Sequence, residues 1–162
     1  MTILPSSGAI SERTEVLHGE KNVVNTVLQF TSKAKSRIDA CVDHTRPSLV
    51  VEIEQLRKAF LDAKNRAVRL RYVTEITEDN IGYCKELIKI VDELRHIEGI
   101  KGNFYISETE YIAPASLHEK GKPASQIIYS NVKEIVEQQQ YVSDSFWDKS
   151  VSGERKIREI RI

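Results

Sequence analysis

Hydrophobic residues recur along this chain at two spacings, and the order of these spacings predicts alternating helices and strands. Apolar side chains return every three to four positions within residues 20–35, 48–64 and 77–96, which indicates three amphipathic helices. Residues 37–43 and 67–76 instead alternate apolar and polar side chains, so each predicts a short strand. The first two thirds of the chain therefore predict an α/β arrangement.

The last third of the chain carries a different pattern. Three short β-rich runs, at 102–107, 110–116 and 125–131, are separated by turn residues and predict consecutive, partly antiparallel strands. A last amphipathic helix is expected to begin at Asn131. Together these patterns predict an α/β fold in which one mixed sheet is flanked by helices on both faces.

The two ends of the chain differ from the middle. Residues 1–12 are aperiodic and predict a flexible leader, although Ser11 is also a suitable N-cap for a short helix. Residues 13–150 are expected to form one domain. The charged segment 151–162 carries Ile157 and Ile160 three positions apart, and we interpret it as the start of a connecting helix to a downstream module.

Composition narrows the classes of protein to consider. Lys and Arg number 24 and Asp and Glu number 24, so the formal net charge is zero and we expect no nucleic-acid partner. No apolar run approaches the ~20 residues that cross a bilayer, and the first residues lack the pattern of a signal peptide. We therefore expect a cytoplasmic chain without a membrane partner. Cys41 and Cys84 are far apart and predict two buried free thiols.

One short motif raises the possibility of phosphodiesterase chemistry. His118 and Lys120 have the H-x-K spacing with which phospholipase D-type enzymes supply a nucleophile and a phosphate-binding cation, but Ser125 stands where an Asp is required. The surrounding HEKGKP is also typical of a turn, whereas the two catalytic side chains should project from one strand. We interpret it as a basic loop.

A second register fits the strand pattern better. The run before the final strand, SETEYIAPAS, places Glu108 and Glu110 where the His and Lys belong and Ala115 where the Asp belongs. Neither register supplies a complete catalytic set, so we expect the domain itself not to be an enzyme. The histidines have no metal-ligand spacing and no glycine-rich phosphate loop follows a strand, so we expect no metal and no cofactor.

Polar residues at the ends of predicted strands form the candidate ligand site. In open α/β sheets, ligands bind beyond the carboxyl ends of the strands. If the strands are parallel, these residues converge on one cleft suited to a small polar or anionic ligand. The alternative is that they cap helices and pair with neighbouring groups. The candidate residues are Asp43, His44, Thr45, Arg46, Ser48, Thr74, Glu75, Tyr129, Ser130 and Asn131.

Four segments, 27–49, 60–87, 94–114 and 125–149, resemble the sensor region of a family of archaeal signal-transduction histidine kinases. In that family, the region is similar to a phospholipase D-like half-domain that has lost its catalytic residues. The resemblance implies a sensor domain of a two-component system, with a ligand in the pseudo-active-site cleft and a signal leaving through the C-terminal helix. The phosphoacceptor helix and ATP-binding boxes are not in this sequence, so catalysis would belong to a downstream kinase module.

Three other interpretations remain open. The same degenerate module serves as the effector-binding domain of certain archaeal transcription regulators, which the resemblance also permits. A dimerisation module is a further alternative, in which Tyr141, Phe146 and Trp147 of the last helix contribute to the contact of a homodimer. A residual phosphodiesterase requires a second half to complete its site and is the weakest alternative.

Overall fold

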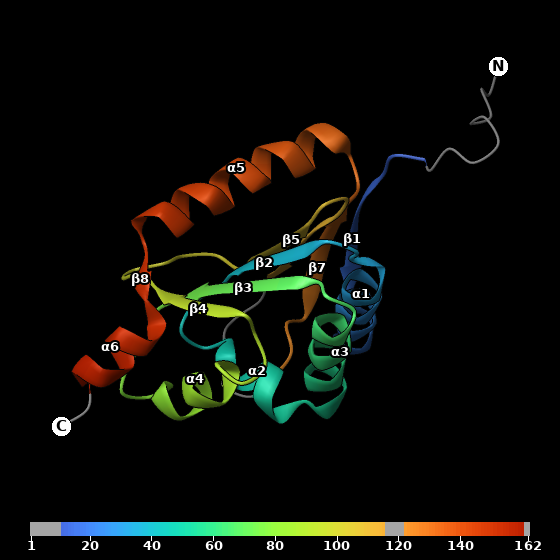
Figure 1. Cartoon of the computed structure of the whole chain (residues 1–162). Coiled ribbons are helices and arrows are strands. Elements are labelled where there is room, and N and C mark those ends of the chain that lie inside the picture. The colour runs from blue at the N-terminus through green and yellow to red at the C-terminus, as the bar shows by residue number, and fades with distance from the viewer. Residues whose placement is uncertain (1–10, 116–121, 161–162) are drawn as a thin grey trace, which may run out of the picture.

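The computed structural model describes residues 11–115 and 122–160, and within them it contains one mixed sheet with helices on both faces (Figure 1). This confirms the predicted fold class. The strands and helices, in chain order, are β1 (Thr14–His18), α1 (Glu20–Lys33), β2 (Arg37–Cys41), α2 (Pro47–Glu52), α3 (Glu54–Asn65), β3 (Arg69–Thr74), α4 (Ile81–Leu87), β4 (Glu93–His96), β5 (Phe104–Ser107), β6 (Tyr111–Ala115), β7 (Gln126–Ser130), α5 (Lys133–Lys149), β8 (Val151–Ser152) and α6 (Gly153–Ile160).

The order of strands across the sheet is β1-β7-β6-β5-β2-β3-β4-β8. Strands β2, β3 and β4 are parallel, as expected for strands joined through helices. Strand β5 is antiparallel to β2, and β6, β7 and β1 follow with antiparallel pairing at every step. Strand β7 therefore runs opposite to β2. This direction determines at which end of the sheet the polar residues at the end of β7 lie.

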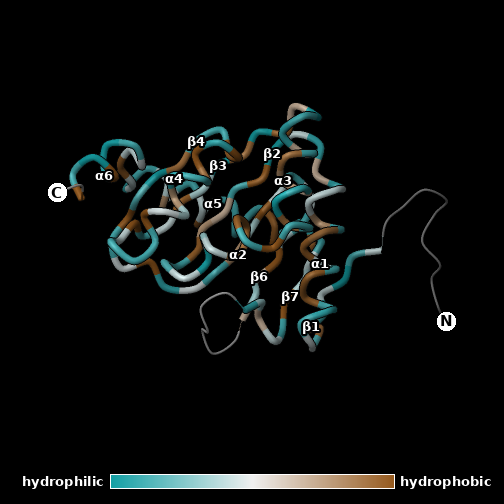
Figure 2. The backbone as a smooth tube through the Cα atoms, turned by 90° about the horizontal axis from the view of Figure 1, so that it is seen from below, coloured by the Kyte–Doolittle hydropathy of each residue, from teal (hydrophilic) through white to brown (hydrophobic). Residues whose placement is uncertain are grey.

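Helices α1 to α4 cover one face of the sheet (Figure 1). The main core lies between this helix layer and the strands, and its largest fully buried side chains include Phe30, Ile38, Leu70 and Tyr72. Alternate residues of β2 and β3 point into this core because successive side chains of a strand face opposite sides of a sheet. Figure 2, seen from this layer, shows brown hydrophobic stretches of β2 and β7 among predominantly teal helix turns and loops.

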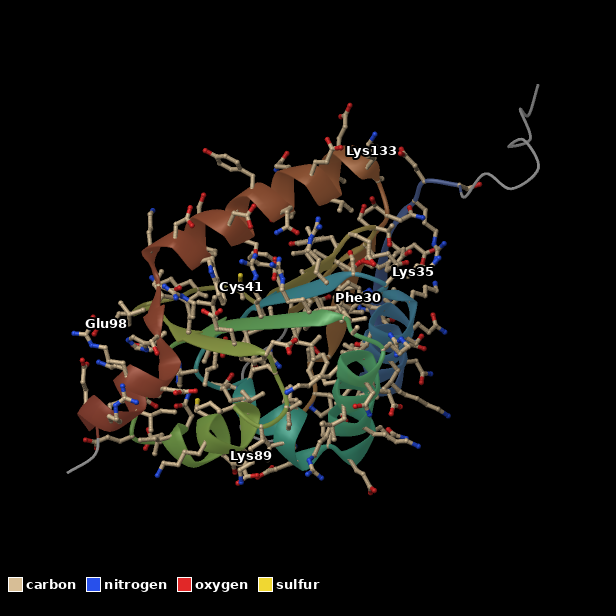
Figure 3. The ribbon with its side chains drawn as sticks, viewed as in Figure 1. Phe30, Lys35, Cys41, Lys89, Glu98 and Lys133 are labelled. Atoms are coloured by element: carbon tan, nitrogen blue, oxygen red, sulfur yellow. The ribbon has the colours of Figure 1, made fainter. Side chains whose placement is uncertain are left out.

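Helix α5 covers the other face through a contact that mixes apolar and charged groups. Phe104 and Ile106 of β5 pack in a second, smaller core with Val136 of α5. Next to it, Asp39 of β2 and Arg71 of β3 face α5 and pair with each other. Cys41 lies between the sheet and this helix (Figure 3), and it is a buried free thiol, as is Cys84.

Two expected helices contain strands in the structure. The segment after Ser11 is strand β1, which pairs with β7, and not a helix. The predicted helix 77–96 contains only α4 (Ile81–Leu87), and its last residues form β4. Leu94 and His96 are buried on one side of this strand, which gains backbone pairing with β3. A helix could bury the same apolar residues but could not extend the sheet.

The segment after residue 150 packs onto the domain. Strand β8 pairs with β4, and Ile157 of α6 belongs to the main core with 6% of its surface exposed. The expected leader lies mostly outside the described residues, as do His118 and Lys120 of the H-x-K motif. Within the described part of the chain, no helix combines the length and hydrophobicity that a membrane span requires.

Candidate functional site

The predicted ligand residues lie at opposite ends of the sheet and form two separate groups. Residues 43–48 follow β2, and Thr74 and Glu75 lie at the end of β3. The third set, residues 129–131, lies at the end of β7. Since β7 is antiparallel to β2, the carboxyl end of β7 lies at the same end of the sheet as the start of β2. The single cleft expected from parallel strands is therefore not formed. In Figure 3, Lys35 marks the end where β2 begins and Glu98 lies towards the opposite end, beyond β4.

At the carboxyl ends of the parallel strands, Asp43 organises a buried hydrogen-bond network. Its Oδ1 accepts hydrogen bonds from the backbone amide (2.9 Å) and hydroxyl (2.5 Å) of Thr45. Its Oδ2 accepts one from the Asn103 amide at 2.9 Å, and its backbone carbonyl accepts one from the Thr74 hydroxyl at 2.9 Å. These bonds hold the loop after β2 against β3 and β5, so Asp43 stabilises the fold at this end of the sheet.

The remaining members of this group are also built into the fold. Arg46 is buried and forms the N-cap of α2, with Pro47 and Ser48 in the first turn. Arg46 also borders an otherwise apolar cavity of about 30 Å³, which holds at most a few water-sized groups. His44 is exposed. The backbone carbonyls of His44 and Glu75 accept hydrogen bonds from the Asn80 amide at 3.0 and 2.8 Å.

His96 belongs to this end of the sheet and gives a pH-dependent prediction. Its Nδ1 accepts a hydrogen bond from the Ile76 amide at 2.9 Å. Burial, helped by the Lys156 ammonium and opposed by Glu98 and Glu75, lowers the pKa of His96 below its ordinary 6.5. The unfolded chain therefore binds a proton near pH 6.5 that the folded chain does not bind. The free energy of unfolding should therefore fall as the pH is lowered from about 6.5 to the pKa of His96 in the folded state.

This dependence can be measured by urea unfolding between about pH 7.5 and pH 5.5. The His96→Gln variant is expected to show a shallower fall than the wild type, and the exposed His44→Gln control should keep the wild-type fall. An unchanged pH dependence in His96→Gln would contradict this assignment.

At the other end of the sheet, the end of β7 meets β1 and the chain before it. Asn131 Oδ1 accepts a hydrogen bond from the Arg13 amide at 2.7 Å, and the Asn131 amide donates to the Ser11 carbonyl at 3.1 Å. The Ser130 and Thr14 hydroxyls lie 2.9 Å apart in a hydrogen bond. Asn131 therefore does not cap α5, whose N-cap is Val132.

The start of β6 lies beside this end of β7, because Tyr111 is the register partner of Ser130. Glu108 and Glu110 lie in the turn between β5 and β6, just before β6 and not on the strand where the second register expects them. Glu108 Oε1 accepts hydrogen bonds from the backbone amides of Lys35 and Ser36, the latter at 2.8 Å. We call this end of the sheet, with residues 108–111 and 129–131, the pseudo-catalytic end. It contains Glu108 and Glu110, which the second register aligns with the catalytic His and Lys.

Glu110 borders a polar cavity of about 100 Å³ between α1, β1 and β7. Tyr129 donates a hydrogen bond to Glu110 Oε2, and the Lys33 ammonium lies 3.7 Å from the same oxygen. Burial, together with this hydrogen bond, raises the pKa of Tyr129 well above its ordinary value, so the phenol stays protonated and remains a donor. The cavity is lined by Arg13, Glu15, Leu17, Thr26, Gln29, Phe30, Lys33, Glu110 and Tyr129.

Among the predicted ligand residues, only Tyr129 lines this cavity. Lys33, Gln29 and Thr26 come from one face of α1. Arg13 directly precedes β1, and Glu15 and Leu17 are alternate residues of that strand. Their sequence signal was weak because polar residues on an amphipathic helix are usually solvated. Glu110 was detectable, since the second register had already placed it at a catalytic position.

No family model matches this sequence. No curated protein matches it either.

Three solved structures share its fold. NucT from Helicobacter pylori is 9% identical with a TM-score of 0.70, covering 88% of this chain and 99% of that chain. Nuc from Salmonella typhimurium, a phospholipase D family member, is 13% identical with a TM-score of 0.69, covering 88% and 98%. The fold is therefore phospholipase D-like, as the sequence resemblance implied.

The third structure is the archaeal chromatin protein TrmBL2, described as showing a novel mode of DNA binding. It is 15% identical with a TM-score of 0.63 over 92% of this chain, and this chain spans 56% of its length. The sequence-based exclusion of nucleic acid as a partner is contradicted by this similarity and was wrong. Zero net charge describes the whole chain and does not exclude a local basic surface. These three structures give no support to the histidine-kinase part of the prediction.

Proposed function

We propose that this chain is a non-catalytic, phospholipase D-like input domain that binds a small polar ligand at the pseudo-catalytic end. The observation that carries the proposal is the presence of Glu108 and Glu110 at the positions where the second register requires a nucleophilic His and a cationic Lys. A carboxylate at the Lys position repels a phosphodiester instead of neutralising it. Glu108 is in addition occupied by two backbone amides.

The proposed domain passes ligand occupancy to an attached module. Helix α5 begins directly after the pseudo-catalytic end, so a movement of residues 129–131 bears on this helix first. Two kinds of module fit the proposal. The similarity to part of TrmBL2 supports an effector domain in a regulator that contacts DNA. A sensor domain of a cytoplasmic histidine kinase, as the sequence resemblance implies, is the other.

A direct contact with nucleic acid is the second candidate function. It is favoured by the similarity to TrmBL2 and by three exposed cations, Lys35, Arg66 and Arg69. They lie close together, since Arg66 donates to the Ala34 carbonyl at 3.2 Å and the Arg69 amide donates to the Ser36 carbonyl at 3.0 Å. Cations of this kind contact phosphates without reading sequence.

The experiment compares three readouts on the purified chain. We expect no hydrolysis of bis(p-nitrophenyl) phosphate above the buffer rate. Thermal unfolding against a panel of small amines, carboxylates, polyols and phosphates should reveal a compound that stabilises the fold by about 2–3 kcal/mol at 100-fold excess over its Kd. Turnover that disappears in a Glu110→Gln variant would contradict the proposal, as would a panel without any stabilising compound.

The third readout is a titration with fluorescent double-stranded DNA at two salt concentrations. Binding that weakens with salt and in the Lys35→Gln/Arg69→Gln double variant would establish the second candidate. The matched control is Lys85→Gln/Lys89→Gln, which removes two exposed charges on the side of the molecule where α4 lies (Figure 3).

A further inference from the structure

We infer that the polar cavity beside Glu110 binds a small primary ammonium ion, with the Glu110 carboxylate as its partner. This inference rests on the proposed function and names the class of its ligand. It reverses the charge preference of the phospholipase D-like fold at this position, because a buried carboxylate selects a cation where a Lys would select a phosphoryl group.

Glu110 has unused hydrogen-bond acceptor capacity. Its side chain is 7% exposed, and an ionised carboxylate offers about four acceptor positions. Within the described residues, one hydrogen bond is present, from the Tyr129 phenol to Oε2, and Oε1 is buried without a hydrogen-bond partner. A buried acceptor that is left unsatisfied is costly, and an added donor removes this cost.

Lys33 lies near Glu110 without a close contact to it. Its ammonium lies 3.7 Å from Glu110 Oε2, beyond the 2.7–2.9 Å that is usual for a charge-assisted hydrogen bond. The Lys33 side chain is 55% exposed at the end of α1. It therefore neutralises Glu110 only loosely. A free ammonium ion can approach more closely and donate directly, while Lys33 turns into solvent.

The remaining walls of the cavity suit a short amine in size and chemistry. Leu17 and Phe30 supply apolar surface for a short carbon chain, and Thr26 and Gln29 supply polar groups for a hydroxyl. Since an engineered cavity of about 150 Å³ holds benzene, the 100 Å³ present here suits a ligand of only a few non-hydrogen atoms.

The charges at the mouth of the cavity do not favour an anion. Arg13 is engaged by Glu15 at 3.0 Å, and its guanidinium lies 4.7 Å from the centre of the Tyr129 ring. The four charged residues of the lining are two cations and two carboxylates, so their formal charges cancel. The carboxylate of Glu110 is the most buried of the four, and it sets the sign of the ligand charge at the bottom of the site.

The test is a titration of ¹⁵N-labelled protein with ethanolamine near neutral pH and constant ionic strength, followed by amide chemical shifts. Ethanolamine should bind with a Kd on the order of 1 mM, which is typical of so small a ligand. Ethylene glycol replaces the ammonium with a hydroxyl at the same size and should bind at least roughly tenfold more weakly.

Variants separate binding from folding. Glu110→Gln keeps the shape and an acceptor for Tyr129, and it should weaken ethanolamine binding about tenfold or more. Lys33→Gln removes the competing ammonium and should strengthen binding. Glu86→Gln, which removes an exposed carboxylate on α4, should leave the Kd unchanged. Opposite effects of the first two substitutions would not arise from a merely structural role of Glu110.

Equal binding of ethylene glycol, or an unchanged Kd in Glu110→Gln, would overturn the ammonium assignment. Tighter binding of inorganic phosphate than of ethanolamine would overturn it as well. Each of these results would overturn the ammonium assignment alone. The proposed function would stand if a different compound of the thermal panel binds the domain. No stabilisation by any compound of the panel would contradict both.

Discussion

Replacement of Asp39 with alanine is expected to lower the free energy of unfolding by about 3–5 kcal/mol, because it leaves a largely buried cation without its partner. Arg71 donates to both oxygens of Asp39, at 2.7 and 2.8 Å, across adjacent strands. The Asp39 side chain is 3% exposed and the Arg71 side chain 14%. The hydrogen bond to Asp39 raises the pKa of Arg71, so the guanidinium stays charged throughout the accessible pH range.

Equilibrium unfolding in urea measures this loss, and Asp144→Ala is the matched control. Asp144 also contacts Arg71, at 3.4 Å, but its side chain is 55% exposed. An exposed partner at this distance contributes less than about 1 kcal/mol. If Asp39→Ala were as mild as Asp144→Ala, the buried pair would not organise the contact between the sheet and α5.

The Asp39–Arg71 pair also positions α5. The Gln140 amide donates to Asp39 Oδ2 at 2.8 Å, and the Trp147 ring lies 4.3 Å from the Arg71 guanidinium. Polar groups of this kind hold a helix at one place, because each hydrogen bond is lost when the helix slides. The face of α5 towards the sheet is therefore fixed in register by charged and polar groups, whereas the helix layer below packs through an apolar core.

The second large effect is expected for Ile157→Ala, which should cost about 2–5 kcal/mol of unfolding free energy. Ile157 is buried in the main core, although it lies in the charged segment at the end of the described chain. Helix α6 approaches β4 closely: a Cβ on Gly153 would lie 2.5 Å from the Leu94 carbonyl oxygen. Only glycine permits this contact, so the first turn of α6 is built against the sheet.

The control for Ile157→Ala is Arg158→Ala, an exposed substitution on the same helix that should change stability by less than about 0.5 kcal/mol. Chemical or thermal unfolding of both variants separates the two positions. Equal, small effects would mean that α6 is only a solvated connection. The predicted connecting helix to a downstream module is not tested by the packing of α6.

Much of the fold could be predicted from local patterns. The spacing of apolar residues located α1, β2, β3 and the three strands β5 to β7, because each pattern matches the period of its element. Strand β4 was missed because Leu94 also continues the helical spacing of the preceding segment. The pairing that converts Glu93–His96 into a strand comes from β3, which is about 20 residues away in sequence.

The candidate site was harder to predict because it depends on strand direction. Thr74 and Ser130 both end strands, but one strand is parallel to β2 and the other is antiparallel to it. The local sequence pattern of β7 gives no indication of its direction in the sheet. Similarly, Asp39 and Arg71 become neighbours only through the register of β2 with β3. Glu110 was accessible from sequence only through the second register of a degenerate catalytic motif.

In the proposed function, a ligand binds at the pseudo-catalytic end and not at the carboxyl ends of the parallel strands. Hydrogen–deuterium exchange, with and without the compound that stabilises the chain most, tests this claim directly. With the compound bound, we expect slower exchange in residues 11–18, 26–35 and 108–112, around the cavity beside Glu110. Protection confined to residues 43–48 and 74–80 would contradict it and return the ligand to the Asp43 end of the sheet.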